Sequence, residues 1–274
     1  MNALNELSLS SYANAFDRGL PLEVVRQRAP AVFATSAHES LSEKYSFIPT
    51  VDVLKGLMHA GFLPVEARQT RTRRASPLHA RHIIRLRPRF QTVTLRDSVA
   101  EVVLLNSHDG SSTYWLRLGL MRVVCLNGLL TSRGAFPAYC VSHRGNVVDE
   151  VITGALKLSE EFENLAARVE QMERRQMFKD EQIRFAEKAV ALRYPDPAQR
   201  GMEASQLLTC RRPEDLGEDL WTTLNKTEEW LLRGGLSRRS ASGRLTRTRR
   251  ITSLKEDIRL HSALWALAEE VLAA

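Results

Sequence analysis

The spacing of apolar residues predicts a mixed α and β structure for the first half of the chain. A helix is expected after Pro49, with Thr50 as its cap and an apolar stripe that runs to Gly61. Runs with imperfect period-two alternation predict strands over residues 63–73, 79–87, 99–105 and 113–118, and a short one over 139–141. The apolar run 119–130 fits a helix or a buried strand, and the helix is preferred.

Helical patterns dominate after Asn146, over residues 147–177, 179–193, 216–232 and 254–272. The segment "RGGLSRRSASGRLTRTRR" separates the last two and predicts a mobile loop over 233–252. The expected fold class is α+β, with an N-terminal antiparallel sheet and packed helices followed by an all-helical C-terminal half. The expected organisation is a flexible arm over 1–20, a basic α+β domain over 21–146 and a helical region over 147–274.

Length and composition are those of a globular protein. The chain has 274 residues, of which 43% are hydrophobic and 26% charged, enough to bury a core. It holds no apolar run of about 18 residues and no secretory pattern at its start, so neither a membrane partner nor secretion is expected. Its three cysteines lie far apart, which predicts reduced, mostly buried thiols in a cytoplasmic protein.

The basic charge of the chain is uneven. The formal net charge is +7, and arginines cluster over 68–89 and 233–250, in windows that hold no acidic residue. Such clusters are typical of proteins that bind polyanions, chiefly nucleic acid, and DNA is the expected partner here. A solvated basic surface without a partner is the alternative. The arginines expected to contact phosphates are Arg68, Arg71, Arg73, Arg81, Arg85, Arg87, Arg244, Arg247, Arg249 and Arg250.

Two polar segments are further candidates. Asn106, Ser107 and His108 precede Asp109-Gly110 between two expected strands, and they are predicted to border the nucleic-acid groove. A plain turn is the alternative. Catalysis is disfavoured, because adjacent His108 and Asp109 would point to opposite faces of a strand. His143 and Arg144 precede Asn146 at the start of the long helix, where free backbone N–H groups suit a phosphate.

The chain shows no motif for other chemistry. It contains no HExxH, CxxC, GxGxxG or GxxxxGK[ST] spacing, so no metal, nucleotide or other cofactor is expected. Cys125 lies in an apolar run and favours a structural thiol over a nucleophile. No catalytic residue is predicted.

Several segments in fixed order resemble one known family. They include "YSFIPTVDVLKGLMHAGFLPVEARQTRTR", "VVLLNSHDGSSTY", "HRGNVVDEVITGA" and the C-terminal "LWTTLNKTEEWLLRGGLSRRS". The resemblance is to the domain family of unknown function numbered nine-three-two, also called uncharacterised protein family three-eighty. It implies a cytoplasmic protein of bacterial prophages and plasmids, with no residue of established role. Leu126 departs from the family, in which Thr is expected before Asn-Gly.

These patterns predict a non-enzymatic nucleic-acid-binding protein of a bacterial mobile element. Single-strand binding or annealing in DNA recombination or replication is the expected role, by analogy of pattern with single-strand-annealing proteins. A protein-binding modulator of a host defence complex is one alternative, and a metal-dependent nuclease or other hydrolase is another. A homo-oligomer and a host protein partner stay open.

Overall fold

The computed structural model describes residues 18–41, 45–70, 76–90, 93, 95, 97–123, 127–131, 134–143, 145–240 and 243–274. The chain divides into two compact units that alternate along the sequence. Unit 1 comprises residues 1–94, 100–119 and 136–162, and unit 2 comprises residues 95–99, 120–135 and 163–274. Each unit is described by itself.

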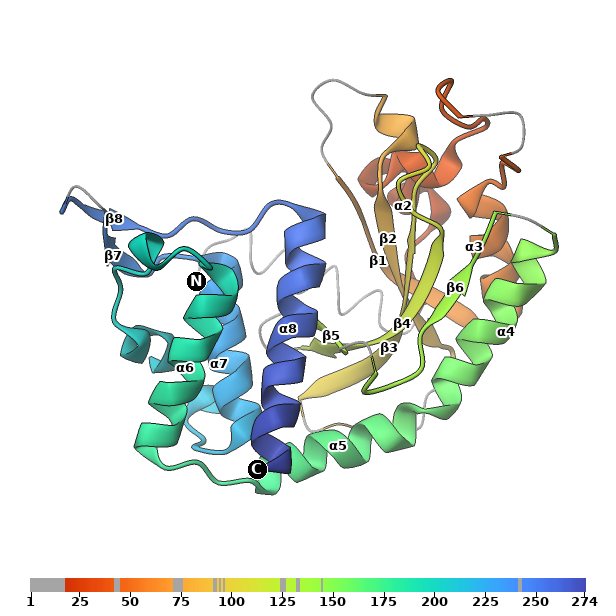
Figure 1. Ribbon diagram of the computed structural model, residues 1–274. Coiled ribbons are helices and arrows are strands. Elements are labelled where there is room, and N and C mark those ends of the chain that lie inside the picture. Colours follow the sequence, from red (N-terminus) through yellow and green to blue (C-terminus); the bar gives the residue numbers. More distant parts are fainter. Residues whose placement is uncertain are drawn as a thin grey trace. The chain divides into compact units, whose positions relative to one another are not determined.

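The first half of the chain forms an antiparallel sheet, as predicted (Figure 1). Its strands lie in the order β1-β2-β3-β4-β5, and β6 also pairs with β4. Most residues of the long strands are buried. In β2, which reads "HIIRLRP", every residue from His82 to Arg87 is buried. The strands are β1 (Phe62–Gln69), β2 (His82–Pro88), β3 (Ser98–Asn106), β4 (Tyr114–Arg122), β5 (Asn127–Leu130) and β6 (Tyr139–Val141).

Helices cover the sheet within unit 1. They are α2 (Leu22–Arg28), the short 3-10 helices η1 (Pro30–Phe33) and η2 (Pro77–His79), α3 (Thr50–His59) and α4 (Val147–Glu160). Helix α3 packs against β1 and α4, and α4 also packs against β6. The apolar stripe of α3, which includes Val53, Leu54 and Leu57, is fully buried by these contacts.

Unit 2 is built around three helices that pack on one another, α6 (Lys179–Arg193), α7 (Leu220–Arg233) and α8 (Leu254–Ala273) (Figure 1). It also contains most of α5 (Phe162–Arg174) and the 3-10 helices η3 (Pro197–Gln199), η4 (Ala204–Leu208) and η5 (Pro213–Asp215). Helix α7 is buried almost all round, although it reads "LWTTLNKTEEWLLR". Such a helix must satisfy polar and charged groups inside the protein.

The C-terminal half was predicted to be all helical, and this prediction was wrong. Ser237–Arg239 (β7) and Leu245–Arg247 (β8) pair as a two-stranded antiparallel sheet. These strands lie within the segment that was predicted to be a mobile loop over 233–252. A Gly-rich and Arg-rich composition resembles a loop, but strands can form there when backbone partners are within reach.

Other elements differ from the prediction in instructive ways. A helix was expected over 119–130, but the residues up to Arg122 continue β4 and Asn127–Leu130 form β5. A strand covered on both faces lacks polar alternation, so periodicity cannot distinguish it from a buried helix. The helix expected over 147–177 is two helices, α4 and α5, which meet at Glu161. Helix α3 begins at Thr50 itself, and no side chain caps it.

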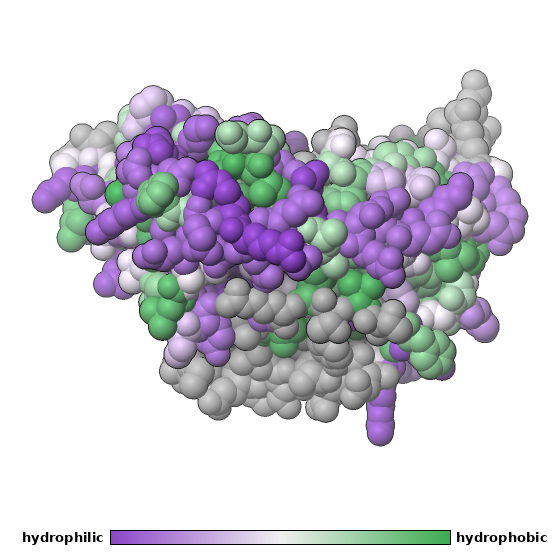
Figure 2. Space-filling view, turned by 90° about the horizontal axis from the view of Figure 1, so that it is seen from below, coloured by the Kyte–Doolittle hydropathy of each residue, from purple (hydrophilic) through white to green (hydrophobic). Residues whose placement is uncertain are grey.

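The surface shown in Figure 2 is dominated by hydrophilic residues, with hydrophobic residues in smaller groups among them. Within the described part of the chain, none of the helices has the length and apolarity needed to cross a membrane. The prediction of mostly buried thiols was wrong for Cys140 and Cys210, which are exposed. Cys125 and Leu126 lie outside the described residues.

Candidate nucleic-acid interface

The segment from Asn106 to Gly110 forms the turn between β3 and β4. The carboxylate of Asp109 accepts a hydrogen bond from the backbone N–H of Ser111 at 2.9 Å, and Gly110 has a φ of 75°. This positive φ favours glycine, and a Cβ on Gly110 would also lie 2.6 Å from the flexible end of the Leu41 side chain. His108 is buried and Asp109 is exposed, and both lie in the turn beyond the end of β3.

A buried polar cluster lies beneath this turn in unit 1, and the hydroxyl of Thr50 is its centre. This oxygen lies 2.9 Å from His82 Nε2, 3.1 Å from His108 Nε2 and 3.0 Å from Asn106 Nδ2. His82 Nδ1 donates to the carbonyl of Ala80 at 2.9 Å, so Nε2 of a neutral His82 accepts the Thr50 proton. Thr50 then accepts from Asn106 and from His108, which carries its proton on Nε2.

Burial keeps the histidines of this cluster uncharged. It lowers the pKa of His82 to about 4 and the pKa of His108 to about 3. Burial also lowers the pKa of His143, whose Nε2 lies 3.1 Å from Asn106 Oδ1. The Tyr45 hydroxyl lies 3.2 Å from Nδ1 of His143. This arrangement is an internal hydrogen-bond network with no exposed charge.

The structure therefore places several predicted groove residues inside unit 1. Asn106, Ser107 and His108 are fully buried, and His143 is nearly so. They were expected to border a surface, but they instead hold the end of the sheet against α3. Arg144 lies outside the described residues. Among the described residues, no three His, Cys, Asp or Glu side chains are grouped so that they could hold a metal ion.

Four arginines of the first cluster, residues 68–89, have partners within unit 1: Arg68, Arg81, Arg85 and Arg87. Arg85 and Arg87 are only 1% and 3% exposed, and both reach the fully buried carboxylate of Glu101, at 3.0 and 2.6 Å. Buried arginines paired in this way cannot reach a phosphate without breaking the pair. Arg68 is exposed but pairs with Glu66 at 2.7 Å.

The remaining members of the first cluster differ in their surroundings, and Arg89 is exposed. Arg81 donates to the carbonyl of Ser111 at 2.7 Å. Arg71 and Arg73 lie outside the described residues. Of the predicted phosphate contacts of this cluster that the structure describes, Arg85 and Arg87 are buried, whereas Arg68 and Arg81 have partners nearer the surface.

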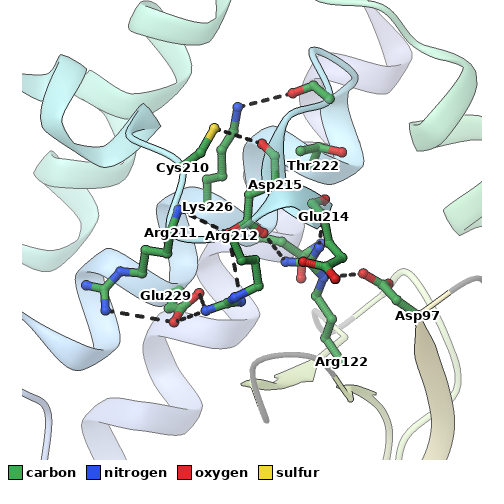
Figure 3. Close-up of polar contacts among 12 residues, drawn as sticks. Asp97, Arg122, Cys210, Arg211, Arg212, Glu214, Asp215, Thr222, Lys226 and Glu229 are labelled. Atoms are coloured by element: carbon green, nitrogen blue, oxygen red, sulfur yellow. Dashed lines mark hydrogen bonds and ion pairs between the residues drawn. The ribbon is translucent and has the colours of Figure 1, made fainter. Parts of the chain in front are cut away.

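Unit 2 holds a buried ion network of Asp97, Arg122, Arg212, Asp215 and Glu229 (Figure 3). Arg122 lies 2.6 Å from Asp97 and 2.7 Å from Asp215, and Arg212 lies 2.7 Å from Glu229. Glu229 also faces Arg211 and Arg233, at 3.9 and 3.5 Å. The network ties β4 and η5 to α7, and its Glu229 offsets part of the charge of Arg233, which lies just before Gly234.

Helix α7 makes a second buried charge pair with α8. His261 Nδ1 lies 2.5 Å from Glu228 and Nε2 lies 3.3 Å from Asp257. Burial alone would lower the pKa of His261, but the two carboxylates outweigh it and raise the pKa to about 9. His261 is therefore a cation at neutral pH, unlike the histidines of unit 1.

Immediately after α7, residues 237–250 form a structure that we term the arginine hairpin. Its strands pair Ser237 with Arg247, Arg238 with Thr246 and Arg239 with Leu245. The segment contains no acidic residue. Among the described residues, none of its exposed arginines pairs with a carboxylate; these are Arg239, Arg244, Arg247, Arg249 and Arg250.

The base of the arginine hairpin is held firmly by the rest of unit 2. The Gln206 side chain accepts from the N–H of Ser237 at 2.9 Å and donates to its carbonyl at 3.0 Å. Gly234 has a φ of 73°, and a side chain there would lie 2.6 Å from the carbonyl of Thr248. Only glycine allows this close approach, so the hairpin leaves α7 in a defined direction.

The residues that sequence reasoning missed are mainly the carboxylates. Glu101 is a lone acid in the apolar run "VAEVVLL", a pattern that can signal a buried charge with a cationic partner. Asp215 and Glu229 carry no such signal, because they lie in polar segments that resemble exposed surface. Thr50 was predicted to cap a helix, whereas in the structure its hydroxyl is the centre of a buried network.

The fold and these sites define an α+β protein with a buried histidine cluster in one unit and an exposed arginine hairpin in the other. The family model described as "Domain of unknown function (DUF932)" matches residues 37–265, and the chain belongs to this family. The UPF0380 proteins YfjQ and YafZ of Escherichia coli (strain K12) are 39% and 38% identical to it, over 93% of each chain. No solved structure matches the chain significantly.

Proposed function

We propose that this protein binds nucleic acid through the arginine hairpin. One observation carries the proposal: five exposed arginines lie on an anchored hairpin, with no carboxylate partner among the described residues. Unpaired guanidinium groups attract phosphates and displace the counterions around a nucleic acid. The proposed setting is a bacterial mobile element, as the family resemblance implies, with a role in DNA recombination or replication by analogy with single-strand-annealing proteins.

The decisive test compares two variants with the same loss of charge. The first is R244S/R247S/R249S/R250S, which empties the hairpin. The control is R168S/R174S/R184S/R259S, four exposed arginines of unit 2 that each pair with a carboxylate. Electrophoretic mobility shifts at low salt are expected to show about 100-fold weaker binding by the first variant and less than about fivefold weaker binding by the control.

The outcomes separate the proposal from its alternatives. Equal losses in both variants would mean that net charge, and not the hairpin, governs binding. If the hairpin variant keeps its affinity but melts several degrees lower, the arginines hold the helices together and the proposal fails. A wild-type protein that binds no nucleic acid at low salt would favour a protein partner.

Salt dependence provides a second test. If all five hairpin arginines contact phosphates, the log of the binding constant should fall against the log of salt concentration with a slope of about −4 to −5. The slope of R244S/R247S/R249S/R250S should be near −1. A flat response in the wild-type protein would contradict phosphate binding.

The hydrolase alternative is tested by incubating the protein with DNA and Mg²⁺ or Mn²⁺. Binding alone leaves the DNA intact. Cleavage that disappears in His108→Ala or Asp109→Ala would replace the proposal with an enzymatic one.

A further inference from the structure

The two faces of the arginine hairpin differ. Paired residues of an antiparallel ladder share a face, and successive residues alternate between faces. Arg238 and Thr246 therefore share one face, which points inward, because Arg238 lies over the Tyr194 ring at 5.6 Å. The other face carries Arg239 and Leu245 as one pair and Ser237 and Arg247 as the next.

The second face combines positive charge with an apolar side chain. Leu245 is 67% exposed and lies between Arg239, its cross-strand partner, and Arg247, two residues along its own strand. An exposed leucine among unpaired arginines gains nothing from the folded protein itself. It fits a polyanion that also offers an apolar contact.

Nothing in the hairpin suits the stacking of unpaired bases. Residues 237–250 contain no aromatic residue. The aromatic rings at its base are already covered, since Arg211 lies 3.6 Å over Trp230 and Arg193 lies 5.3 Å over Tyr194. Proteins that bind single strands usually stack bases on exposed aromatic rings. The hairpin therefore fits a duplex better than a single strand.

The shape of the hairpin also indicates which kind of duplex it fits. The major groove of B-form DNA is wide enough to admit a two-stranded β-ribbon, and it displays the methyl groups of thymine. The major groove of A-form RNA is too deep and narrow for side chains to enter. A ribbon with outward arginines and a central leucine matches the first groove and not the second.

We infer that the nucleic acid is duplex DNA, with the outward face of the arginine hairpin in the major groove and Leu245 against thymine methyl groups. This inference rests on the proposed function and adds the class of substrate to it. Arg239 and Arg247 reach the phosphates on either side of Leu245. The contact with methyl groups is an apolar burial and adds no charge.

The first test is a competition among duplex DNA, single-stranded DNA and duplex RNA of equal length and sequence, at one salt concentration. Duplex DNA should compete at least about tenfold better than the other two. Equal competition by single-stranded DNA, with loss of all binding in R244S/R247S/R249S/R250S, would overturn this inference and leave the proposed function intact. No binding by any of the three would instead sink the proposed function.

The second test removes the apolar contact alone. Leu245→Ser should weaken binding to duplex DNA about fivefold. Leu216→Ser is the matched control, because Leu216 is 70% exposed, lies in the same unit and is outside the hairpin. An equal effect of both variants, or no effect of Leu245→Ser, would overturn the role of Leu245.

A third measurement needs no variant. Replacing thymine by deoxyuridine throughout the duplex removes the methyl groups and leaves the phosphates and base pairing in place. The wild-type protein should bind this duplex about threefold more weakly, and Leu245→Ser should bind both duplexes equally. A preference for thymine that survives in Leu245→Ser would assign the methyl contact to another residue.

Discussion

The first arginine cluster, residues 68–89, and the arginine hairpin, residues 237–250, have similar compositions but different partners. Arg85 and Arg87 of the first cluster point into unit 1, where both pair with Glu101 of the neighbouring strand and Arg85 also pairs with Glu66. Arg247 and Arg249 of the hairpin are exposed, and no described carboxylate pairs with them. An acid-free run in the sequence thus predicts a basic surface only if no acid arrives from another strand or helix.

The same comparison applies to the histidines of the two units. In unit 1, burial without a carboxylate partner keeps His82 and His108 neutral. In unit 2, Glu228 and Asp257 keep His261 charged although it is equally buried. In both comparisons the position of a few carboxylates decides the charge state of the surrounding groups.

The largest effect is expected for Glu101→Ala. Removing this carboxylate leaves Arg85 and Arg87 buried without their shared anion, which should lower the free energy of unfolding by about 3–5 kcal/mol. Urea denaturation measures this change. Glu170→Ala is the control, since its pair with Arg174 is exposed and should contribute less than about 1 kcal/mol. Equal losses would mean that Glu101 has no special structural role.

Acidification should destabilise unit 1. The folded-state pKa values of His82 and His108, about 4 and about 3, lie below the unfolded value of about 6.5. Between these values the unfolded chain binds more protons, so stability falls as the pH falls, by roughly 2 kcal/mol for each histidine at pH 5. Hydrogen exchange followed by mass spectrometry reports each unit separately. Unchanged protection of β2 and β3 between pH 7 and pH 5 would contradict this.

Unit 2 should respond in the opposite direction. The folded-state pKa of His261, about 9, lies above the unfolded value, so its contribution is complete below about pH 6.5 and is lost as the pH rises toward 9. Protection of α7 and α8 should decrease from pH 7 to pH 9. His261→Gln should remove this dependence, whereas His59→Gln, an exposed histidine of α3, should leave it in place.

A moderate effect is expected at the base of the hairpin. Gly234→Ala places a methyl group 2.6 Å from the carbonyl of Thr248 at a φ of 73°, which should cost about 1–3 kcal/mol and weaken DNA binding by displacing the hairpin. Gly243→Ala is the control, with a φ of 76° but nothing within 4 Å. Binding that weakens equally in both variants would show that backbone strain, and not the close approach, matters.

The smallest effect is expected for Arg68→Ser. This arginine is exposed and paired with Glu66, so its loss should change the free energy of unfolding by less than about 0.5 kcal/mol. The slope of DNA binding against salt should also stay the same. A slope that becomes less steep by about 1 would show that Arg68 contacts a phosphate, as the sequence alone suggested.

Local patterns predicted much of the fold. Helix α6 over 179–193 and strand β6 over 139–141 have the predicted bounds, and the turn at Asp109-Gly110 was expected from its residues. Such elements depend on neighbours in the sequence, through capping, periodicity and turn chemistry. The run 119–130 was predicted incorrectly, because burial on both faces removes the alternation that identifies a strand.

For the candidate site, too, some features follow from the sequence and others depend on the tertiary structure. The sequence by itself determined that arginines cluster in two places, that the turn after β3 gathers polar residues, and that α7 and α8 flank a basic segment. Only the tertiary structure decided that Glu101 pairs with two arginines of the first cluster, that Thr50 contacts two neutral histidines and that the second cluster forms an exposed hairpin. The physical reason is that charge state and exposure depend on groups that strand pairing and helix packing bring together from distant positions, which composition cannot express.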